Sequence, residues 1–198
     1  MVNTVAANND YPHAPWWNFE PSQETSYNPT ACLIGFILKF EDKNSKLFEL
    51  ACVLAKEAYS YFKLHFPMES MHTVSCFVEL YEYIKESSMN DLLDIKEFSA
   101  LLHEQIKHVI TYDTSKWTVD YVCKPSLFIG TKTSDFYMDN KEICDYECEF
   151  ILNTQESDGT WGIIWSWTDY PEQWNISKNW WKSDLIIKNL RYIKAIHS

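Results

Sequence analysis

Apolar residues recur every three or four positions along most of this chain, which is the pattern of amphipathic α-helices. The first such stretch is apolar nearly all round, and this predicts a helix that is buried on most sides. Asn28 and Ser177 are suited to cap the first and the last helix, and Pro67 ends the second. In total the pattern predicts six helices, at about 28–40, 45–66, 72–86, 95–111, 141–154 and 177–196.

Three stretches lack this periodicity. Residues 1–27 contain three prolines and are predicted to form an extended N-terminal segment. Residues 112–138 are predicted to form a long loop rich in aromatic residues, and 156–176 a second one. This second loop lies inside a helix pair that spans 139–198. The whole chain, 1–198, is expected to be a single domain because its length is typical of one.

The composition favours an all-α fold. Only 4 of the 198 residues are Gly, and long amphipathic stretches dominate, so strand content is expected to be close to zero. Hydrophobic residues make up 46% of the chain. This is enough apolar material to form a core, so a disordered chain is excluded.

The net charge of −11 limits the partners. Nucleic-acid binding and docking on anionic lipid both require clustered Lys and Arg, so neither is expected. No apolar run is long enough for a membrane span, and the N-terminus lacks the basic and apolar regions of a signal peptide. The six cysteines include no C-x-x-C pair. We therefore expect a reduced, cytoplasmic protein.

The most specific signal is a twelve-residue stretch that reads F-I-L-N-T-Q-E-S-D-G-T-W and ends at Trp161. A helix that ends near Gln155 leaves backbone carbonyls without partners, and Gly159 supplies the positive φ of a tight turn. Trp161 can then fold back over the helix end and cover the Gln155 amide. We interpret Gln155, Gly159 and Trp161 as a structural clasp.

This stretch resembles the QW motif of squalene cyclases and their prenyltransferase relatives. On that resemblance the chain is identified as a member of the bacterial prenyltransferase/squalene-cyclase (terpenoid-cyclase) repeat superfamily, with the best match over 141–198. The resemblance implies an α/α toroid, in which inner helices are buried all round and outer helices on one side. A closed toroid needs roughly twice as many helices as the pattern predicts, so a partial toroid is expected.

The catalytic groups of that superfamily are not recognisable here. The cyclases protonate a polyene with a D-x-D-D acid, and the chain contains no such motif. Protein prenyltransferases hold zinc with Asp, Cys and His, but no His lies near Asp120-x-x-Cys123 or near the pair Asp145 and Cys148. The stretch H-E-Q-I-K-H at 103–108 spaces its histidines five apart, whereas a zinc helix needs four. We expect no metal and no cofactor.

Aromatic residues make up 16% of the chain and gather in the loops and at the start of the last helix. In a toroid these positions line one end of the cavity, so we expect an aromatic pocket for an apolar, isoprenoid ligand. The alternative is that the rings fix long loops onto the helices. The predicted ligand-binding residues are Trp16, Trp17, Trp165, Trp167, Tyr170, Trp174, Trp180 and Trp181.

Three functions remain open at this point. The first is binding of the isoprenoid ligand, with turnover undecided. The second is a non-catalytic half toroid that docks a partner chain. The third is a carbohydrate-active toroid in which Asp169 and Glu172 flank the reacting bond, although their spacing in a loop favours a solvated surface pair.

The resemblance also bears on assembly. The chain begins as if halfway through a repeat, so the apolar helix over 30–40 is expected to lack its outer neighbour and to have an uncovered face. Exposed apolar area drives association at about 25 cal/mol per Å². We therefore expect a homodimer, or a partner chain that completes the toroid.

Overall fold

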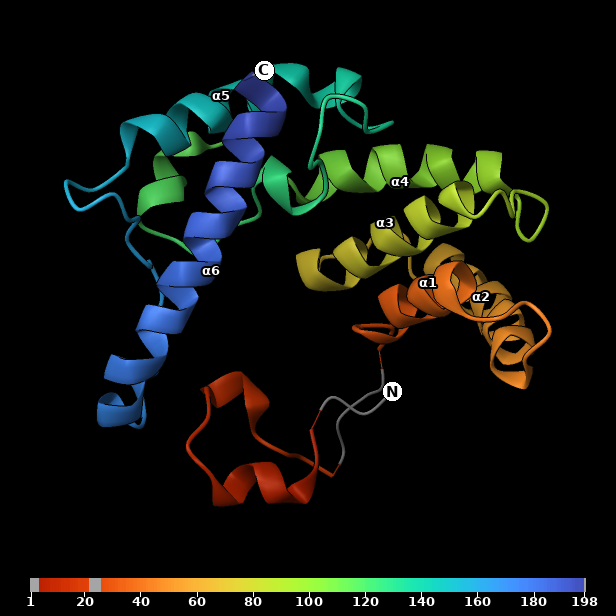
Figure 1. The fold of residues 1–198 in the computed structure, drawn as a ribbon, viewed down its shortest axis with the longest axis horizontal. Coiled ribbons are helices and arrows are strands. Elements are labelled where there is room, and N and C mark those ends of the chain that lie inside the picture. The colour runs from red at the N-terminus through yellow and green to blue at the C-terminus, as the bar shows by residue number, and fades with distance from the viewer. Residues whose placement is uncertain (1–3, 22–25, 198) are drawn as a thin grey trace. The chain divides into compact units, whose positions relative to one another are not determined.

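The computed structural model describes residues 4–21 and 26–197, and every element within them is helical (Figure 1). This confirms the predicted all-α class. The backbone divides into two compact units: among the described residues, unit 1 contains 26–109 and unit 2 contains 4–21 and 110–197. The single domain expected from the length thus corresponds to two compact units, described separately below. The toroid stays a prediction.

Unit 1 consists of four helices: α1 (Thr30–Phe40), α2 (Lys46–Leu64), α3 (Met71–Glu86) and α4 (Ile95–Val109). α1 packs against both α2 and α3, and α3 also packs against α4. Gly35 permits the close approach of α1 to α3, since a Cβ at this position would lie 2.8 Å from the Tyr83 ring and 3.0 Å from the Leu80 Cα. All four helices lie within about two residues of the predicted ends.

The core of unit 1 is aromatic. Phe62, Phe77 and Phe98 are fully buried, and the Phe62 ring centroid lies 4.9 Å from that of Phe77 and 5.5 Å from that of Phe98. Local caps fix where the helices begin. The Ser45 hydroxyl accepts from the Phe48 amide at the start of α2. The Ser70 hydroxyl accepts from the Thr73 amide at the start of α3.

Unit 2 combines two α-helices with short 3₁₀ helices. The α-helices are α5 (Lys141–Asn153) and α6 (Pro171–His197), and the 3₁₀ helices are η1 (Ala6–Asp10), η2 (Pro15–Trp17), η3 (Thr114–Thr118), η4 (Pro125–Leu127) and η5 (Met138–Asn140). The N-terminal segment is therefore not extended throughout, and the long loop at 112–138 contains η3 and η4. Pro at the first position favours the helical turn in both η2 and η4.

The last helix begins earlier than predicted. α6 begins at Pro171, not at Ser177, because Pro at the first helical position has its φ already fixed for the helix. Tyr170, with φ of 58°, turns the chain immediately before it. Trp174, expected in a loop, is consequently on the first turn of α6.

α5 packs against α6, η4 and η5. Trp117 is fully buried in unit 2, and its indole N–H donates to the Thr111 carbonyl at 2.8 Å.

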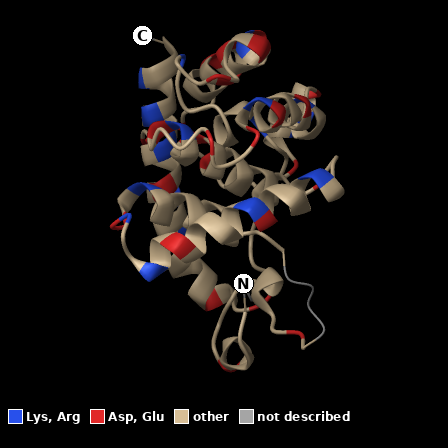
Figure 2. Cartoon of the chain, turned by 90° about the vertical axis from the view of Figure 1, so that its right-hand side faces the viewer, with Lys and Arg blue, Asp and Glu red and all other residues tan. Residues whose placement is uncertain are grey.

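None of the helices in the described residues combines the length and the apolar character needed to cross a membrane. Lys and Arg positions alternate with Asp and Glu positions along the ribbon in Figure 2, and no helix drawn there is uniformly basic.

Candidate functional site

Five tryptophans of unit 2 form a connected set of rings, which we call the tryptophan cluster: Trp16, Trp165, Trp167, Trp174 and Trp181. Trp165 is the hub, with ring centroids 5.8 Å from Trp16, 5.0 Å from Trp174 and 5.1 Å from Trp181. Trp167 joins through Trp174 at 5.6 Å. The cluster therefore brings together η2, the loop after α5, and the first turns of α6.

The cluster is open to solvent. Trp165, Trp167 and Trp174 are half-buried, while Trp16 and Trp181 expose 55% and 43% of their surface. Two of the contacts to Trp165 are edge-to-face, an arrangement that leaves ring faces available. The indole nitrogen of Trp167 is buried and has no hydrogen-bond partner among the described residues.

The N-terminal segment is held to this region by His13. Its ring lies 5.8 Å from that of Tyr170, and its Nε2 lies 2.6 Å from the Asn18 Oδ1. The pKa of His13 is raised, first by the hydrogen bond to the Tyr11 carbonyl, then by that to Asn18, with a smaller effect of the Asp169 charge. The polar contacts of His13 thus fix the conformation of the segment that carries Trp16, and the ring contact with Tyr170 joins that segment to the loop before α6.

Five of the eight predicted ligand residues form the cluster, and a sixth, Tyr170, contacts the His13 ring. Trp17 and Trp180 are 44% and 71% exposed and make no ring contact with the cluster within the described residues. The expected concavity at these rings stays a prediction. A depression of about 400 Å³ lies elsewhere in unit 2, between 132–149 and the C-terminal end of α6.

The two candidate carboxylates lie at the edge of the same region. Asp169 is in the loop before α6 and Glu172 is in the first turn of that helix, and both are exposed. A carboxylate that protonates an apolar substrate needs apolar surroundings to raise its pKa. Their role in carbohydrate chemistry stays a prediction.

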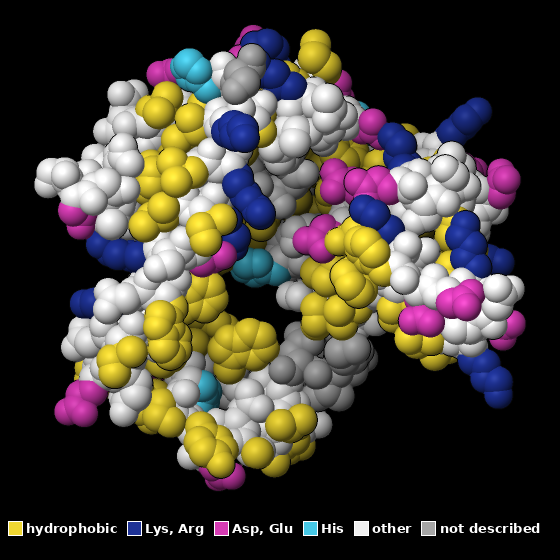
Figure 3. All heavy atoms as spheres, viewed as in Figure 1, with side chains coloured by type: hydrophobic (Ala, Val, Ile, Leu, Met, Phe, Trp, Pro, Cys, Tyr) yellow, Lys and Arg dark blue, Asp and Glu magenta, His cyan; other side chains and the backbone are white. Residues whose placement is uncertain are grey.

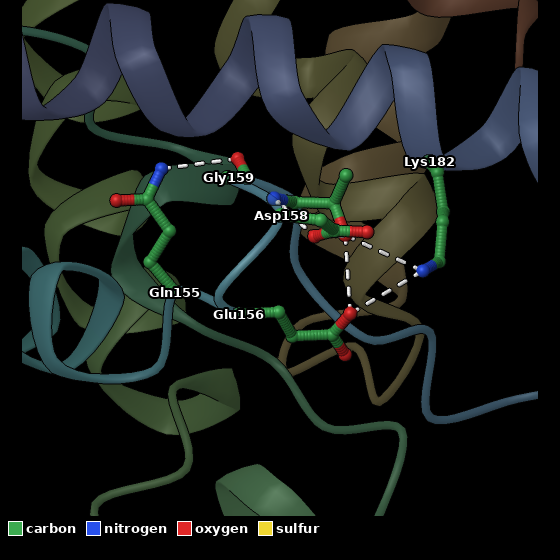
Figure 4. A network of polar contacts seen from close by, with 6 residues as sticks. Gln155, Glu156, Asp158, Gly159 and Lys182 are labelled. Atoms are coloured by element: carbon green, nitrogen blue, oxygen red, sulfur yellow. Dashed lines mark hydrogen bonds and ion pairs between the residues drawn. The ribbon is translucent and has the colours of Figure 1, made fainter.

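The QW stretch forms a tight loop at the end of α5 (Figure 4). The Gln155 amide donates to the Gly159 carbonyl at 3.0 Å, and Gly159 adopts the expected positive φ, 84°. The Glu156 amide donates to the Thr160 carbonyl at 2.8 Å. Lys182 of α6 reaches the Glu156 carboxylate at 3.4 Å. The loop is therefore joined both to itself and to the next helix.

Trp161 closes this loop. It is 5% exposed, and its indole N–H donates at 2.8 Å to the Ile151 carbonyl in the last turn of α5, a carbonyl that also accepts from the Thr154 amide at 3.3 Å. The Gln155 side chain is exposed, so the expected burial of its amide under Trp161 is not observed. The clasp thus depends mainly on Trp161.

Sequence reasoning missed a buried carboxyl group in unit 2. Glu147 of α5 is 1% exposed and accepts from Ser126, from its amide at 2.7 Å and from its hydroxyl at 2.6 Å. Lys124 lies close by, with its Nζ 4.7 Å from the centroid of the Phe150 ring. Since Ser126 occupies both carboxylate oxygens, Glu147 acts as a cap for η4. Nothing in the local sequence distinguishes it from the neighbouring acids.

Burial raises the pKa of Glu147, against the opposing effect of the Ser126 hydrogen bonds. A raised folded-state pKa contributes stability that is complete below the ordinary value of 4.5 and is lost as the pH rises through the folded pKa. We expect the free energy of unfolding to fall as the pH rises from 4.5, and Glu147→Gln to flatten this fall. Urea denaturation between pH 4.5 and 8 measures it, with the exposed Glu142→Gln as control. Equal slopes for the two variants would contradict the assignment.

The cysteines offer no metal centre in the described part of the chain, where no three Cys, His, Asp or Glu side chains gather as ligands would. Burial raises the pKa of the Cys144 thiol to about 12.

Comparison of the chain with protein-family models, with curated proteins and with solved structures finds no match. The functional argument therefore rests on the geometry of the tryptophan cluster.

Proposed function

We propose that the protein binds an apolar, isoprenoid-type ligand on the tryptophan cluster, within a partial α/α toroid of the terpenoid-cyclase type. The observation that carries the proposal is the convergence of five tryptophan rings from three separate segments, with ring faces open to solvent. Soluble proteins rarely place this much aromatic surface together without using it for binding.

The chemistry of the cluster suits a flexible apolar chain with one polar end. The ring faces offer apolar contact along the chain, and the polar end can stay in water because the cluster is open to solvent. A fifteen-carbon isoprenoid that buries roughly 300 Å² would gain about 7 kcal/mol before the cost of association. We therefore expect dissociation constants that are micromolar or weaker.

The residues support binding of the isoprenoid ligand without its chemical conversion. The chain carries no D-x-D-D acid. The two carboxylates nearest the cluster, Asp169 and Glu172, are exposed to water. A water-exposed carboxyl group lacks the apolar surroundings that would make it a proton donor for an alkene.

Titration with farnesol, followed by tryptophan fluorescence, tests the proposal. We expect a saturable change in the wild type, and a dissociation constant at least 10-fold higher for Trp165→Ala, which removes the hub of the cluster. Trp180→Ala is the matched control, because Trp180 is exposed outside the cluster. Thermal melts of both variants check that they fold.

Two outcomes would contradict ligand binding at this site. One is a wild-type protein whose fluorescence does not respond to farnesol, and the other is an equal loss of affinity in Trp165→Ala and Trp180→Ala. A response to a soluble oligosaccharide in place of farnesol would favour the carbohydrate reading instead.

A second candidate function, docking of a partner chain, is favoured by α1. Leu33, Phe36 and Phe40 expose 40%, 52% and 60% of their surface on the face opposite the buried Ile34 and Leu38. This uncovered face is the one expected from the sequence. Phe36→Asp should remove partner docking and leave the farnesol titration unchanged, which separates the two functions.

A further inference from the structure

α6 carries apolar side chains on two opposite faces. One face contributes Trp174 and Trp181 to the tryptophan cluster and, further along, buries Tyr192, whose hydroxyl donates to the Cys144 carbonyl of α5 at 3.2 Å. The opposite face holds four residues, which we call the α6 stripe: Ile176, Trp180, Ile187 and Leu190.

The stripe is unusually exposed for its composition. Its exposed fractions are 60% for Ile176, 71% for Trp180, 55% for Ile187 and 53% for Leu190. The spacings of four, seven and three residues put all four on one line, as in the seam of a coiled coil. The N-terminal part of α6 extends away from α5 in Figure 1, and Figure 3 shows hydrophobic side chains at the surface along this helix. A helix that is apolar on two faces is normally covered on both.

The charges beside the stripe are self-complementary. Asp184 and Arg191 lie seven residues apart on the same flank of the stripe. In an antiparallel second copy of α6, each Asp184 would face the Arg191 of the other helix. Asp184 Oδ2 also pairs with Lys188 in its own helix at 2.8 Å, and a carboxylate can accept from both partners. Lys182 points to the other side of α6, where it reaches Glu156.

We propose that the α6 stripe is a docking surface for the α6 helix of a second copy of this chain, in antiparallel orientation. The register set by the two Asp184–Arg191 pairs brings the two Ile187 side chains together at the centre, each flanked by Leu190. Trp180 lies towards each end, and Ile176 lies beyond the end of the partner helix, which is at His197. Because the tryptophan cluster lies on the other face of α6, this interaction is independent of the proposed ligand.

The area of the stripe indicates how strong the contact is. The three stripe residues that meet the partner helix, Trp180, Ile187 and Leu190, present roughly 350 Å² per copy, so two copies would bury about 700 Å² of apolar surface. With a polar rim the total reaches about 1,000 Å², the smallest size expected of a specific interface. We therefore expect a dimer with a micromolar dissociation constant.

Analytical ultracentrifugation of the full chain between 1 and 50 µM tests the proposal. We expect a monomer–dimer equilibrium in the wild type. Trp180→Asp and Ile187→Asp should each raise the dissociation constant on the order of 100-fold, since both put a charge into the apolar contact. Val119→Asp is the matched control, because Val119 is a 68% exposed apolar residue of unit 2 outside the stripe, and it should leave the dimer unchanged.

Charge reversal tests the orientation. Asp184→Arg and Arg191→Asp should each weaken the dimer, and the double variant should restore it, because each reversed charge then meets a reversed partner. Far-UV circular dichroism confirms that the variants fold. A wild-type chain that is monomeric at 50 µM would overturn the proposal, as would a dimer that survives Trp180→Asp. Failure of the double variant to restore the dimer would overturn the antiparallel pairing.

Discussion

Replacing Trp161 by Ala is expected to lower the free energy of unfolding by about 3–5 kcal/mol, the range for removing a buried large aromatic side chain. The ring is 5% exposed, and its indole N–H satisfies the Ile151 carbonyl at the end of α5. The substitution leaves a cavity and removes the shortest hydrogen bond to the Ile151 carbonyl, which keeps its bond from the Thr154 amide at 3.3 Å. Urea denaturation followed by far-UV circular dichroism measures the loss.

Gln155→Ala is the matched comparison within the same loop. The Gln155 amide donates to the Gly159 carbonyl, but the side chain is exposed, so water can replace the bond and the expected loss is about 1 kcal/mol or less. Trp161→Phe keeps one aromatic ring but loses the pyrrole ring and the hydrogen bond, and its loss of stability should fall between the other two. If Gln155→Ala cost as much as Trp161→Ala, the assignment of the clasp to Trp161 would be wrong.

The helices were predictable because their pattern is local. The 3.6-residue period of the apolar residues and the serines at 45 and 70 are sufficient to place α2 and α3. The start of α6 could not be predicted in the same way. Pro171 and Ser177 are both good helix starts, and the sequence alone does not choose between them.

The sequence predicted the region of the candidate site but not which of its tryptophans would contact one another. Trp180 and Trp181 are adjacent in the sequence and were expected to line one cavity together. On a helix, neighbouring residues point about 100° apart. Trp181 consequently joins Trp165, while Trp180 lies on the exposed stripe. Which ring of such a pair turns inward depends on what packs against the helix, and that is a tertiary property.

Gln105 illustrates the same limit in unit 1. The stretch H-E-Q-I-K-H contains two histidines, and their spacing of five residues excludes a zinc site on one helix face. The residue that matters structurally is the glutamine between them. Gln105 is fully buried, its Oε1 accepts from the Met68 amide at 2.8 Å, and its Nε2 donates to the Met68 carbonyl at 2.7 Å. It thus replaces the backbone partners that the segment between α2 and α3 lacks.

Gln105→Leu should therefore lower the free energy of unfolding by about 2–5 kcal/mol. Leu fills a similar volume, so the loss comes from leaving two buried backbone groups at Met68 unpaired, at roughly 1–3 kcal/mol each. Glu104→Leu, at the exposed neighbouring position, should change stability by no more than about 0.5 kcal/mol.

Gln105→Glu separates hydrogen bonding from packing, because it keeps the shape of the side chain. A carboxylate can accept from the Met68 amide but cannot donate to the Met68 carbonyl, whereas the protonated acid can do both. The fold favours the protonated form, so the folded pKa of the new acid would be raised and its contribution to stability would be lost as the pH rises. We expect a smaller loss at pH 4 than at pH 7 in urea denaturation, measured against the wild type at each pH. A loss for Gln105→Glu that is the same at both pH values would show that Gln105 contributes through packing alone.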